Sequence, residues 1–501
     1  MLIRRGSFAA LAGMLAALAL GAGTAHAAQV TVVDGDRATR VDDPSVPAQG
    51  RADLGRPPRT RSRPFASAAA RPGRRAVIKA LRRARRAHRI SRARYRAYRS
   101  AYGRARGLWR RLRGARRAQL GYVILVVERM ALTRRLIPSR MPVLFLELRR
   151  NTQYWRSRPY PGARDWVRFR GSEVLFQYFP GRGLQLHPLG TFKRANALHG
   201  FCIKGGGPCR PAKLRRLLDG MRRLAVRRGR RFIAWEYMFD FGGGRPPWIS
   251  AMATATGLQA YARAAQLLHR PDYVRTARRA LGAYATRPPL GVRTRGPLGG
   301  IAYLQYSFAP RLFIFNAFLT SIQGLRDFSK LTGDARAERL YKRAEPEARR
   351  EVPHSDVGDW SLYNWHGHLS DRNYHEYLRE ILSELCARHV GPVYCTYASR
   401  YRGYQLDPPR LSYLGPGRTS DEQLTRLRFS LSKLSAVELK VYKGGQLAHR
   451  SLATFRRGSG SFLWRPHSAG SYTVRLGAKE LRTGRGLRGR TSATVEVEPG
   501  A

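Results

Sequence analysis

The chain has 501 residues, enough for roughly two to four domains, and its 43% apolar and 10% aromatic content argues against disorder throughout. A formal net charge of +62 favours a polyanionic partner such as nucleic acid, anionic lipid or an acidic polysaccharide, although GC-rich coding also scatters arginines through a chain. No aromatic-interleaved RNA motif and no zinc finger accompanies this charge, so the sequence argues against nucleic acid.

The first 27 residues have the pattern of a secretory signal peptide. Two arginines precede an apolar segment over residues 9–20, and an A-x-A cleavage site follows at residues 25–27. A membrane span needs about 20 apolar residues, and no run in the sequence reaches that length. We therefore expect an exported protein, secreted or retained in the cell envelope, without a membrane span.

Residues 28–75 are rich in Pro, Arg, Ala and Asp and show no periodicity, which predicts a disordered linker. Residues 76–139 then show helical spacing, with apolar positions on one face and arginines on the other. We interpret these arginines as a solvated face, and a grip on a polyanion is the alternative. The sequence thus predicts an N-terminal helical region.

Residues 140–410 change from a mixed segment to continuous helices. Short aromatic runs broken by Gly and Pro predict strands before about residue 198, and helical patterns continue from residue 214 to residue 388. Two helical hairpins, residues 248–284 and 315–350, begin about 65 residues apart and share their design. This repeat predicts a mainly α fold, an incomplete α/α barrel or toroid with short β segments, and a solenoid is the alternative.

The C-terminal part is predicted to be a separate β domain. Pro and Gly cluster over residues 406–420, which marks a boundary, and residues 421–499 alternate between apolar and polar as strands do. An Ig-like β-sandwich fits this length and pattern, and its function is not readable from the sequence.

The four cysteines form two close pairs with C-x6-C and C-x8-C spacing. In an exported chain this spacing predicts two local disulfides, Cys202–Cys209 and Cys386–Cys395. The C-x2-C spacing of a zinc site is absent. Three histidines that lie close together are interpreted as hydrogen-bonding loop residues rather than metal ligands: His366, His368 and His375. We predict no metal and no cofactor.

Five segments carry a resemblance to a known family: FQYFPGRGLQLHPLGTF (176–192), GGGRPPWISAM (242–252), LQYSFAPRLFIFNAFLTSIQGLRDF (304–328), WSLYN (360–364) and NYH (373–375). In this order they resemble the D-glucuronyl C5-epimerase family, especially its bacterial members, over roughly residues 140–390. The resemblance implies a toroidal α/α catalytic domain with a cleft. It also implies inversion of carbon 5 of glucuronate within a heparan-like polysaccharide, the reaction of heparan sulfate biosynthesis.

The resemblance places the catalytic acid and base on tyrosines, which match Tyr306, Tyr363 and Tyr374. A phenol with a pKa near ~10 can protonate a carbanion, and a nearby guanidinium allows a tyrosinate to accept a proton. For Tyr306 the alternative is an ordinary core residue, because an apolar helix follows it. Further residues are predicted to bind the substrate: Tyr178, Gln305, Arg311, Arg372 and His187.

The sequence departs from the family pattern at a few of these positions. Gln305 replaces a Glu before the central tyrosine, Thr254 replaces a Gln, and Asp371 replaces an Arg. Alternative functions therefore stay open: a polysaccharide lyase, a glycan-binding protein without catalytic activity, or a polyanion binder that acts through charge alone. A homodimer is also left open. A possible glycosidase pair, Glu236 and Asp240, is interpreted as structural.

Overall fold

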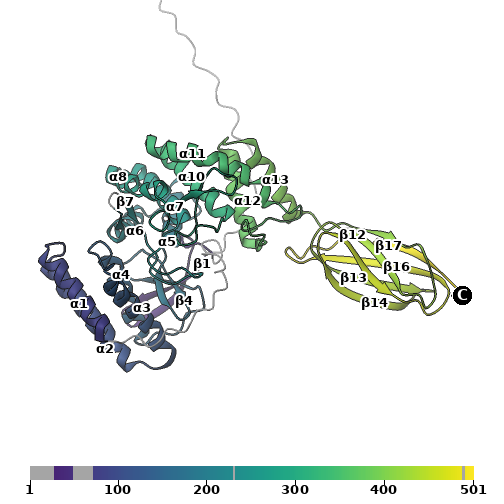
Figure 1. Cartoon of the computed structure of the whole chain (residues 1–501), viewed down its shortest axis with the longest axis horizontal. Helices are drawn as coiled ribbons and strands as arrows, with labels where there is room; N and C mark the ends of the chain where they lie inside the picture. Colours follow the sequence, from purple (N-terminus) through teal and green to yellow (C-terminus); the bar gives the residue numbers. More distant parts are fainter. Residues whose placement is uncertain (1–27, 49–70, 230–231, 488–490, 501) are drawn as a thin grey trace, which may run out of the picture.

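The computed structural model describes residues 28–48, 71–229, 232–487 and 491–500. A helical body is followed by a C-terminal β domain that projects from it beyond the last helix (Figure 1). The signal peptide predicted over residues 1–27 lies outside the described residues, as do residues 49–70 of the predicted linker. In the described part of the chain, no helix is apolar and long enough to span a bilayer.

The prediction of a disordered linker is wrong for residues 28–43, which form a β-hairpin. Strands β1 (Ala28–Asp34) and β2 (Arg37–Asp43) pair with each other, and β1 also pairs in parallel with β3 (Trp166–Phe169). Together with β4 (Phe176–Phe179) and β5 (Gly183–Leu186) they form a sheet in the order β2-β1-β3-β4-β5. The hairpin is ordered by this distant partner strand, which local composition does not reveal.

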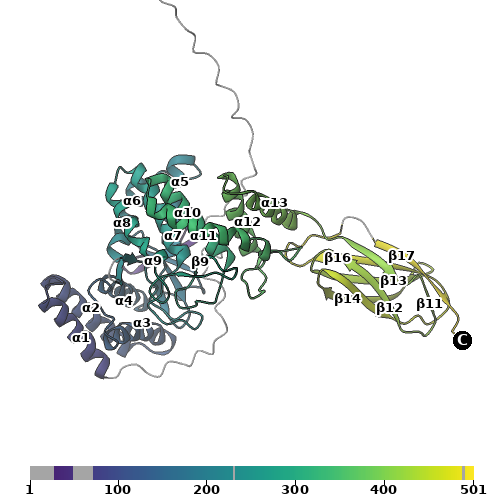
Figure 2. The ribbon, with the colours of Figure 1, turned by 45° about the horizontal axis from the view of Figure 1, so that its top comes forward.

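The N-terminal helices pack beside this sheet. They are α1 (Arg71–Arg86), α2 (Arg92–Arg111), α3 (Gly114–Leu132) and α4 (Met141–Trp155). Helix α1 lies at the outer edge of the helical body in both views (Figures 1 and 2). The apolar faces of these helices join the same core as the helices that follow.

The rest of the helical body consists mainly of helical hairpins. They are α5 (Pro188–Lys204) with α6 (Pro211–Leu224), α7 (Ala251–Leu267) with α8 (Pro271–Ala280), α10 (Phe315–Thr332) with α11 (Ala335–Glu351), and α12 (Arg372–Ala387) with α13 (Pro392–Leu406). Between them lie α9 (Gly282–Ala285), a 3₁₀ turn (Pro353–Ser355), and two small hairpins: β6 (Val226–Arg228) with β7 (Phe232–Ala234), and β8 (Arg293–Arg295) with β9 (Ile301–Tyr303).

The first helices of successive hairpins run side by side in the same direction. The Gln259 amide of α7 donates to Asp327 of α10 at 2.9 Å, and Gln266, further along α7, donates to the Leu331 carbonyl at 3.1 Å. Helices α10 and α12 are joined in the same sense, beginning with Thr320 and Tyr377, whose hydroxyls lie 3.0 Å apart. Parallel first helices are what an α/α toroid requires, and closure of a toroid stays a prediction.

The C-terminal domain is a sandwich of two sheets around its own core. One sheet contains β10 (Leu411–Gly415), β12 (Thr425–Leu431) and β15 (Gly458–Trp464). The other contains β11 (Arg418–Ser420), β17 (Thr491–Glu498), β16 (Gly470–Glu480), β13 (Ser435–Lys443) and β14 (Gln446–Phe455). The domain begins at Leu411, ahead of the predicted start at residue 421, because Pro and Gly interrupt the alternation around β10 and β11.

Candidate active site

The candidate residues gather where the first helices of the hairpins begin. His187 caps α5 by accepting from Gly190 N at 2.9 Å, Ser250 caps α7 by accepting from Ala253 N at 3.1 Å, and Asp371 caps α12 by accepting from Tyr374 N at 2.9 Å. Lys193 of α5 lies 4.0 Å from the ring of Tyr377 of α12, at the same level of both helices. The helix starts therefore share one end of the helical body, and such ends favour anions.

Tyr306 lies on the segment between β9 and α10 and is held by aromatic rings. Its ring stacks on Phe308 at 5.3 Å and approaches Phe241 at 5.6 Å and Trp248 at 5.7 Å, and the residue is 2% exposed. The next residue, Ser307, donates its backbone N–H to Ile249 O at 2.9 Å. The position of the phenol is thus determined by packing, whether its role is catalytic or structural.

Tyr363 and Tyr374 are brought together, with ring centroids 4.8 Å apart. Tyr363 belongs to the loop before α12, where its N–H donates to His368 O at 2.7 Å and its carbonyl accepts from Phe315 N at 3.2 Å. Tyr374 lies in the first turn of α12. The backbone bridge between Ile314 and Asn364 connects this loop to the segment that carries Tyr306.

The loop that carries Tyr363 is supported by a stack of two buried rings. Trp360 stacks on His375 with centroids 3.7 Å apart and planes 10° apart. His375 makes hydrogen bonds to Ser361 Oγ at 2.8 Å and to Tyr401 O at 3.1 Å, and burial lowers its pKa to about 4. A neutral, fully bonded imidazole at this position is a support for Tyr374 rather than a metal ligand.

The other predicted substrate-binding residues differ in their accessibility. Arg372 is exposed at the start of α12, and Arg311 is exposed in the turn that precedes α10. Tyr178 is buried, and its hydroxyl accepts from Gln119 at 3.2 Å. His187 is fully buried between Trp166 and Tyr237, and burial lowers its pKa to about 3. The contact of each with substrate stays a prediction, and for His187 the structure adds a structural role.

The departures from the family pattern have structural uses. Asp371 is the N-cap of α12, and Gln305 accepts from Ser250 Oγ at 3.2 Å, which ties the central segment to the cap of α7. Thr254 donates to Ser250 O at 2.8 Å. Gln305 directly precedes Tyr306 in the chain, and its side chain already has a buried hydrogen-bond partner, Ser250.

A groove of about 1460 Å³ is lined by residues of α5, α7, α10 and α12 and by the segment 44–48. Its lining mixes charges of both signs, including Lys193, Arg263, Arg388, Glu376 and Glu380. It reaches Tyr377, about one helical turn beyond Tyr374, and the three candidate tyrosines do not line it. The groove thus approaches Tyr374 along α12.

One residue near the tyrosines was missed by sequence reasoning. Arg164 lies in a turn before β3 with a positive φ of 70°, and its guanidinium carbon is 5.6 Å from the ring centroid of Phe241, the same ring that Tyr306 approaches. The turn sequence Gly162–Asp165 carries no catalytic motif, so only the backbone conformation and the contacts identify it.

The comparisons with known proteins agree with the family resemblance. The family described as D-glucuronyl C5-epimerase C-terminus matches residues 228–403. A D-glucuronyl C5-epimerase of Caenorhabditis elegans is 29% identical over 131 residues, which cover 24% of this chain and 21% of that protein. An uncharacterized protein of Methanocaldococcus jannaschii is 25% identical over 177 residues, which cover 34% of this chain and 58% of that protein.

The match therefore spans only 21% and 58% of these curated relatives. Among solved structures, cellobiose 2-epimerase from Spirochaeta thermophila aligns with a TM-score of 0.34 and 14% identity, over 62% of this chain and 74% of that chain. A score this low supports no conclusion about fold or activity.

Proposed function

Because residues 228–403 belong to the D-glucuronyl C5-epimerase C-terminal family, we propose that this chain inverts carbon 5 of uronic acid residues within an acidic polysaccharide. The family match supports a carbohydrate epimerase, and the substrate and the catalytic tyrosines are our proposal. The observation that carries it is that all three family tyrosines lie at helix starts: Tyr306 follows Gln305, which is hydrogen-bonded to the N-cap of α7, and Tyr363 and Tyr374 lie together at the start of α12.

The chemistry requires a base and an acid on opposite faces of the sugar. The C5 hydrogen lies next to a carboxylate, so its removal forms a dianionic enolate that needs nearby positive charge or hydrogen-bond donors. One residue takes the proton, and another returns a proton from the other face. In our proposal Tyr306 acts on one face, and Tyr363 or Tyr374 acts on the other. The helix starts contribute partial positive charge toward the enolate.

An anionic polymer is the proposed substrate because the chain carries a net charge of +62. Export is also part of the proposal, since the two disulfides, Cys202–Cys209 and Cys386–Cys395, are compatible with an oxidising compartment. A homodimer stays a prediction. The described residues contain no cluster of metal-ligating side chains, and the proposed acid–base steps use side chains of this chain alone.

The test follows the C5 proton in heavy water. We expect a glucuronate polymer incubated with the protein to gain deuterium at C5, measured by NMR and mass spectrometry, while its chain length stays constant. A lyase would instead shorten the polymer and leave unsaturated ends that absorb ultraviolet light. A glycan-binding protein would bind the polymer without exchange. Absence of exchange across several uronic acid polymers would overturn the proposed reaction.

A further inference from the structure

Arg164 has a backbone conformation that its position in the fold does not explain. The other non-glycine residues with positive φ in the described residues each lie two positions beyond the end of a helix or strand: His88, Arg134, His269, His389 and Glu422. Arg164 instead occupies the third position of a turn closed by Asp165 N donating to Gly162 O at 3.0 Å. With a positive φ, this position favours Gly or Asn.

The turn is held against the sheet on both sides of Arg164. The Arg164 N–H donates to Tyr178 O at 2.9 Å, and the Gln177 amide donates to Arg164 O at 3.0 Å. The Asp165 carboxylate accepts from Gly162 N at 2.7 Å. An unfavourable backbone conformation persists only where its surroundings determine it, and such residues cluster at functional sites.

The conformation directs the Arg164 guanidinium toward the aromatic cluster around Tyr306. Its carbon lies 4.5 Å from the ring centroid of Phe179 and 5.6 Å from that of Phe241. Tyr306 lies against the same Phe241 ring, with centroids 5.6 Å apart. A guanidinium that shares the Phe241 ring with a candidate acid–base residue suits a planar carboxylate, which it can bind through two parallel hydrogen bonds.

We propose that Arg164 binds the carboxylate of the uronic acid residue whose C5 proton is exchanged. This proposal rests on the proposed function for the identity of the sugar. In this proposal Arg164 neutralises the negative charge of the enolate. Arg164 lies before residues 228–403, the segment that matches the family. The enzyme then selects a uronate over the corresponding neutral sugar at this position.

The test uses Arg164→Gly, which removes the cation and supplies the residue that tolerates a positive φ. Binding of a glucuronate oligosaccharide and of its carboxyl-reduced analogue is measured by titration calorimetry, together with thermal unfolding. We expect Arg164→Gly to lose roughly 10–100-fold of the preference for the carboxylate form, the usual worth of a charged hydrogen bond. Its unfolding midpoint should be unchanged or higher, and Arg164→Lys should keep part of the preference.

Arg170→Gln is the matched control, because Arg170 is exposed at the end of β3 and pairs with Asp34. An unchanged preference in Arg164→Gly would overturn the role of Arg164, as would a loss of the same size in Arg170→Gln. The proposed reaction fails by a different result. If the unmutated protein prefers the carboxylate form but exchanges no C5 proton, the binding role of Arg164 stands and the proposed epimerase activity is wrong.

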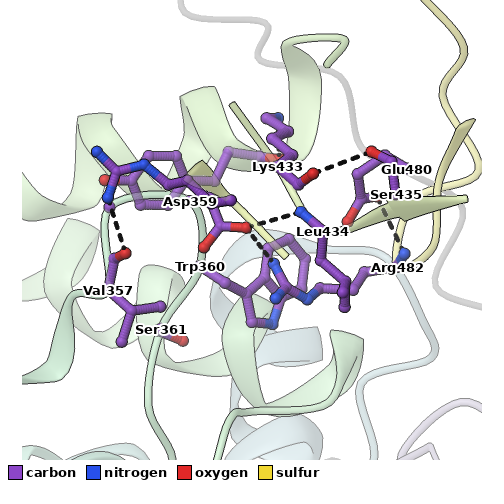
Figure 3. Close-up of polar contacts among 12 residues, drawn as sticks. Val357, Asp359, Trp360, Ser361, Lys433, Leu434, Ser435, Glu480 and Arg482 are labelled. Carbon is purple, nitrogen blue, oxygen red and sulfur yellow. Dashed lines mark hydrogen bonds and ion pairs between the residues drawn. The ribbon is translucent and has the colours of Figure 1, made fainter. Parts of the chain in front are cut away.

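A second, independent observation concerns the junction between the β-sandwich and the helical body. Asp359, in the loop that carries Tyr363, accepts from Leu434 N at 3.1 Å and from Arg482 of the β-sandwich at 3.1 Å (Figure 3). Both charged side chains are largely buried, with 6% and 13% exposed. Removing one partner of a buried pair is costly, so this contact fixes the two domains relative to each other.

The junction continues toward the candidate tyrosines. The guanidinium of Arg482 lies 5.0 Å above the ring of Trp360, and Trp360 stacks on His375, the neighbour of Tyr374. The Trp360 indole also donates to Ser370 O at 2.8 Å, across the loop that carries Tyr363. We infer that Arg482 is a positioning residue: through Asp359 and Trp360 it holds this loop and the start of α12 in place.

The test compares Arg482→Met with Arg485→Met in the full chain. Arg485 donates to Gln405 O at 3.0 Å at the same junction and is the matched control. We expect amide hydrogen exchange over residues 356–374 to accelerate more than 10-fold in Arg482→Met only. If the proposed reaction holds, kcat for C5 exchange falls about 10-fold while KM changes little. Arg482→Lys should show a smaller acceleration of amide exchange and a smaller loss of kcat than Arg482→Met.

Equal amide exchange in the two variants would overturn the positioning role, as would an acceleration spread over the whole helical body. The amide measurement needs no substrate, so it judges Arg482 even if the unmutated protein proves to have no epimerase activity.

Discussion

Tyr306 and the Tyr363–Tyr374 pair are held in place in different ways. Tyr306 is 2% exposed and is fixed by the rings of Phe241, Trp248 and Phe308, inside the core of the helical body. The pair lies on a loop and a helix start, and its support comes from several separate segments. The comparison teaches that one face of the proposed site is set by core packing, whereas the other depends on contacts that can be loosened one at a time.

The largest expected effect comes from Tyr306→Phe, which keeps the ring and its packing but removes the ionisable hydroxyl. If Tyr306 is an acid or base, C5 deuterium uptake by at least one of the two epimers should fall by ~10²–10⁴-fold, which corresponds to roughly 3–5 kcal/mol of barrier. Thermal unfolding should change little. Uptake is measured by NMR on a glucuronate polymer and on an iduronate polymer, under conditions where uptake with the unmutated protein is linear with time.

Tyr303→Phe is the matched control for this variant. Tyr303 lies on β9 and donates to Leu340 O at 2.9 Å, so its change should cost stability, about 1 kcal/mol, and leave exchange intact. Normal exchange in Tyr306→Phe from both glucuronate and iduronate would assign that tyrosine to the core and would move the proposed chemistry entirely to Tyr363 and Tyr374.

Tyr374→Phe tests whether the two regions serve opposite faces of the sugar. With two acid–base residues, each one abstracts the proton from one epimer only. We expect Tyr306→Phe to abolish exchange from one of glucuronate and iduronate, and Tyr374→Phe or Tyr363→Phe to abolish exchange from the other. The measurement is loss of C5 deuterium from polymers labelled in each configuration.

If all three variants impair the same epimer equally, the division of the site into two faces is wrong. If none of the three variants reduces exchange from either epimer, the result would support the glycan-binding alternative, in which the tyrosine hydroxyls only contact the sugar.

From the sequence, the middle of the helical body could be predicted better than its first strand and its last helix. The helix α10 (Phe315–Thr332) follows from a 3.6-residue period, and both disulfides are confirmed by the structure. These features depend on neighbours in sequence, which is why spacing alone predicts them.

Features that depend on distant partners were missed. The strand β1 is stabilised by pairing with β3, far along the chain. The buried stripe of α13 (Pro392–Leu406) consists of Tyr394, Ala398 and Tyr401, which give a weaker apolar signal than Leu, Ile or Val would. The candidate site contains the same kind of omission. The positive φ of Arg164 and the stacking of Trp360 on His375 arise from tertiary contacts that no local motif encodes.

Raising the pH should destabilise the loop that carries Tyr363, and with it the Tyr363–Tyr374 pair, but not the packing of Tyr306. Glu351, at the end of α11, accepts from the Trp365 indole at 3.1 Å, and burial raises its pKa to about 8. The folded protein thus keeps a proton on Glu351 that the unfolded chain releases at pH ~4.5. The stability that this carboxyl contributes is complete below pH ~4.5, falls as pH rises, and is lost above pH about 8. The change is roughly 2–3 kcal/mol between pH 5.5 and 7.5.

We expect opening of residues 356–371, measured by amide exchange corrected for the intrinsic effect of pH, to increase over this range. Glu351→Gln should remove the increase. Glu147→Gln is the matched control, because burial also raises the pKa of Glu147 to about 8, yet this carboxyl accepts from Leu186 N at 3.0 Å, beside β5. A pH response that persists in Glu351→Gln would assign it to another group.

The smallest expected effect concerns the disulfide that joins α12 to α13. Cys386–Cys395 closes a loop with a sequence separation of 9 on the helix that begins beside Tyr374, whereas Cys202–Cys209 closes a separation of 7 at the end of α5. Loops of this size stabilise a fold by roughly 2 kcal/mol each, so both double Cys→Ala variants should lower the unfolding midpoint by a few degrees.

Only the Cys386/Cys395 variant should reduce C5 exchange, by about 2–5-fold, because it frees the helix that carries Tyr374 while leaving the rings around Tyr306 packed. Peptide mass spectrometry without reductant establishes which bridge remains in each variant. A larger loss of exchange in the Cys202/Cys209 variant would mean that the pair is not the more easily loosened face of the site.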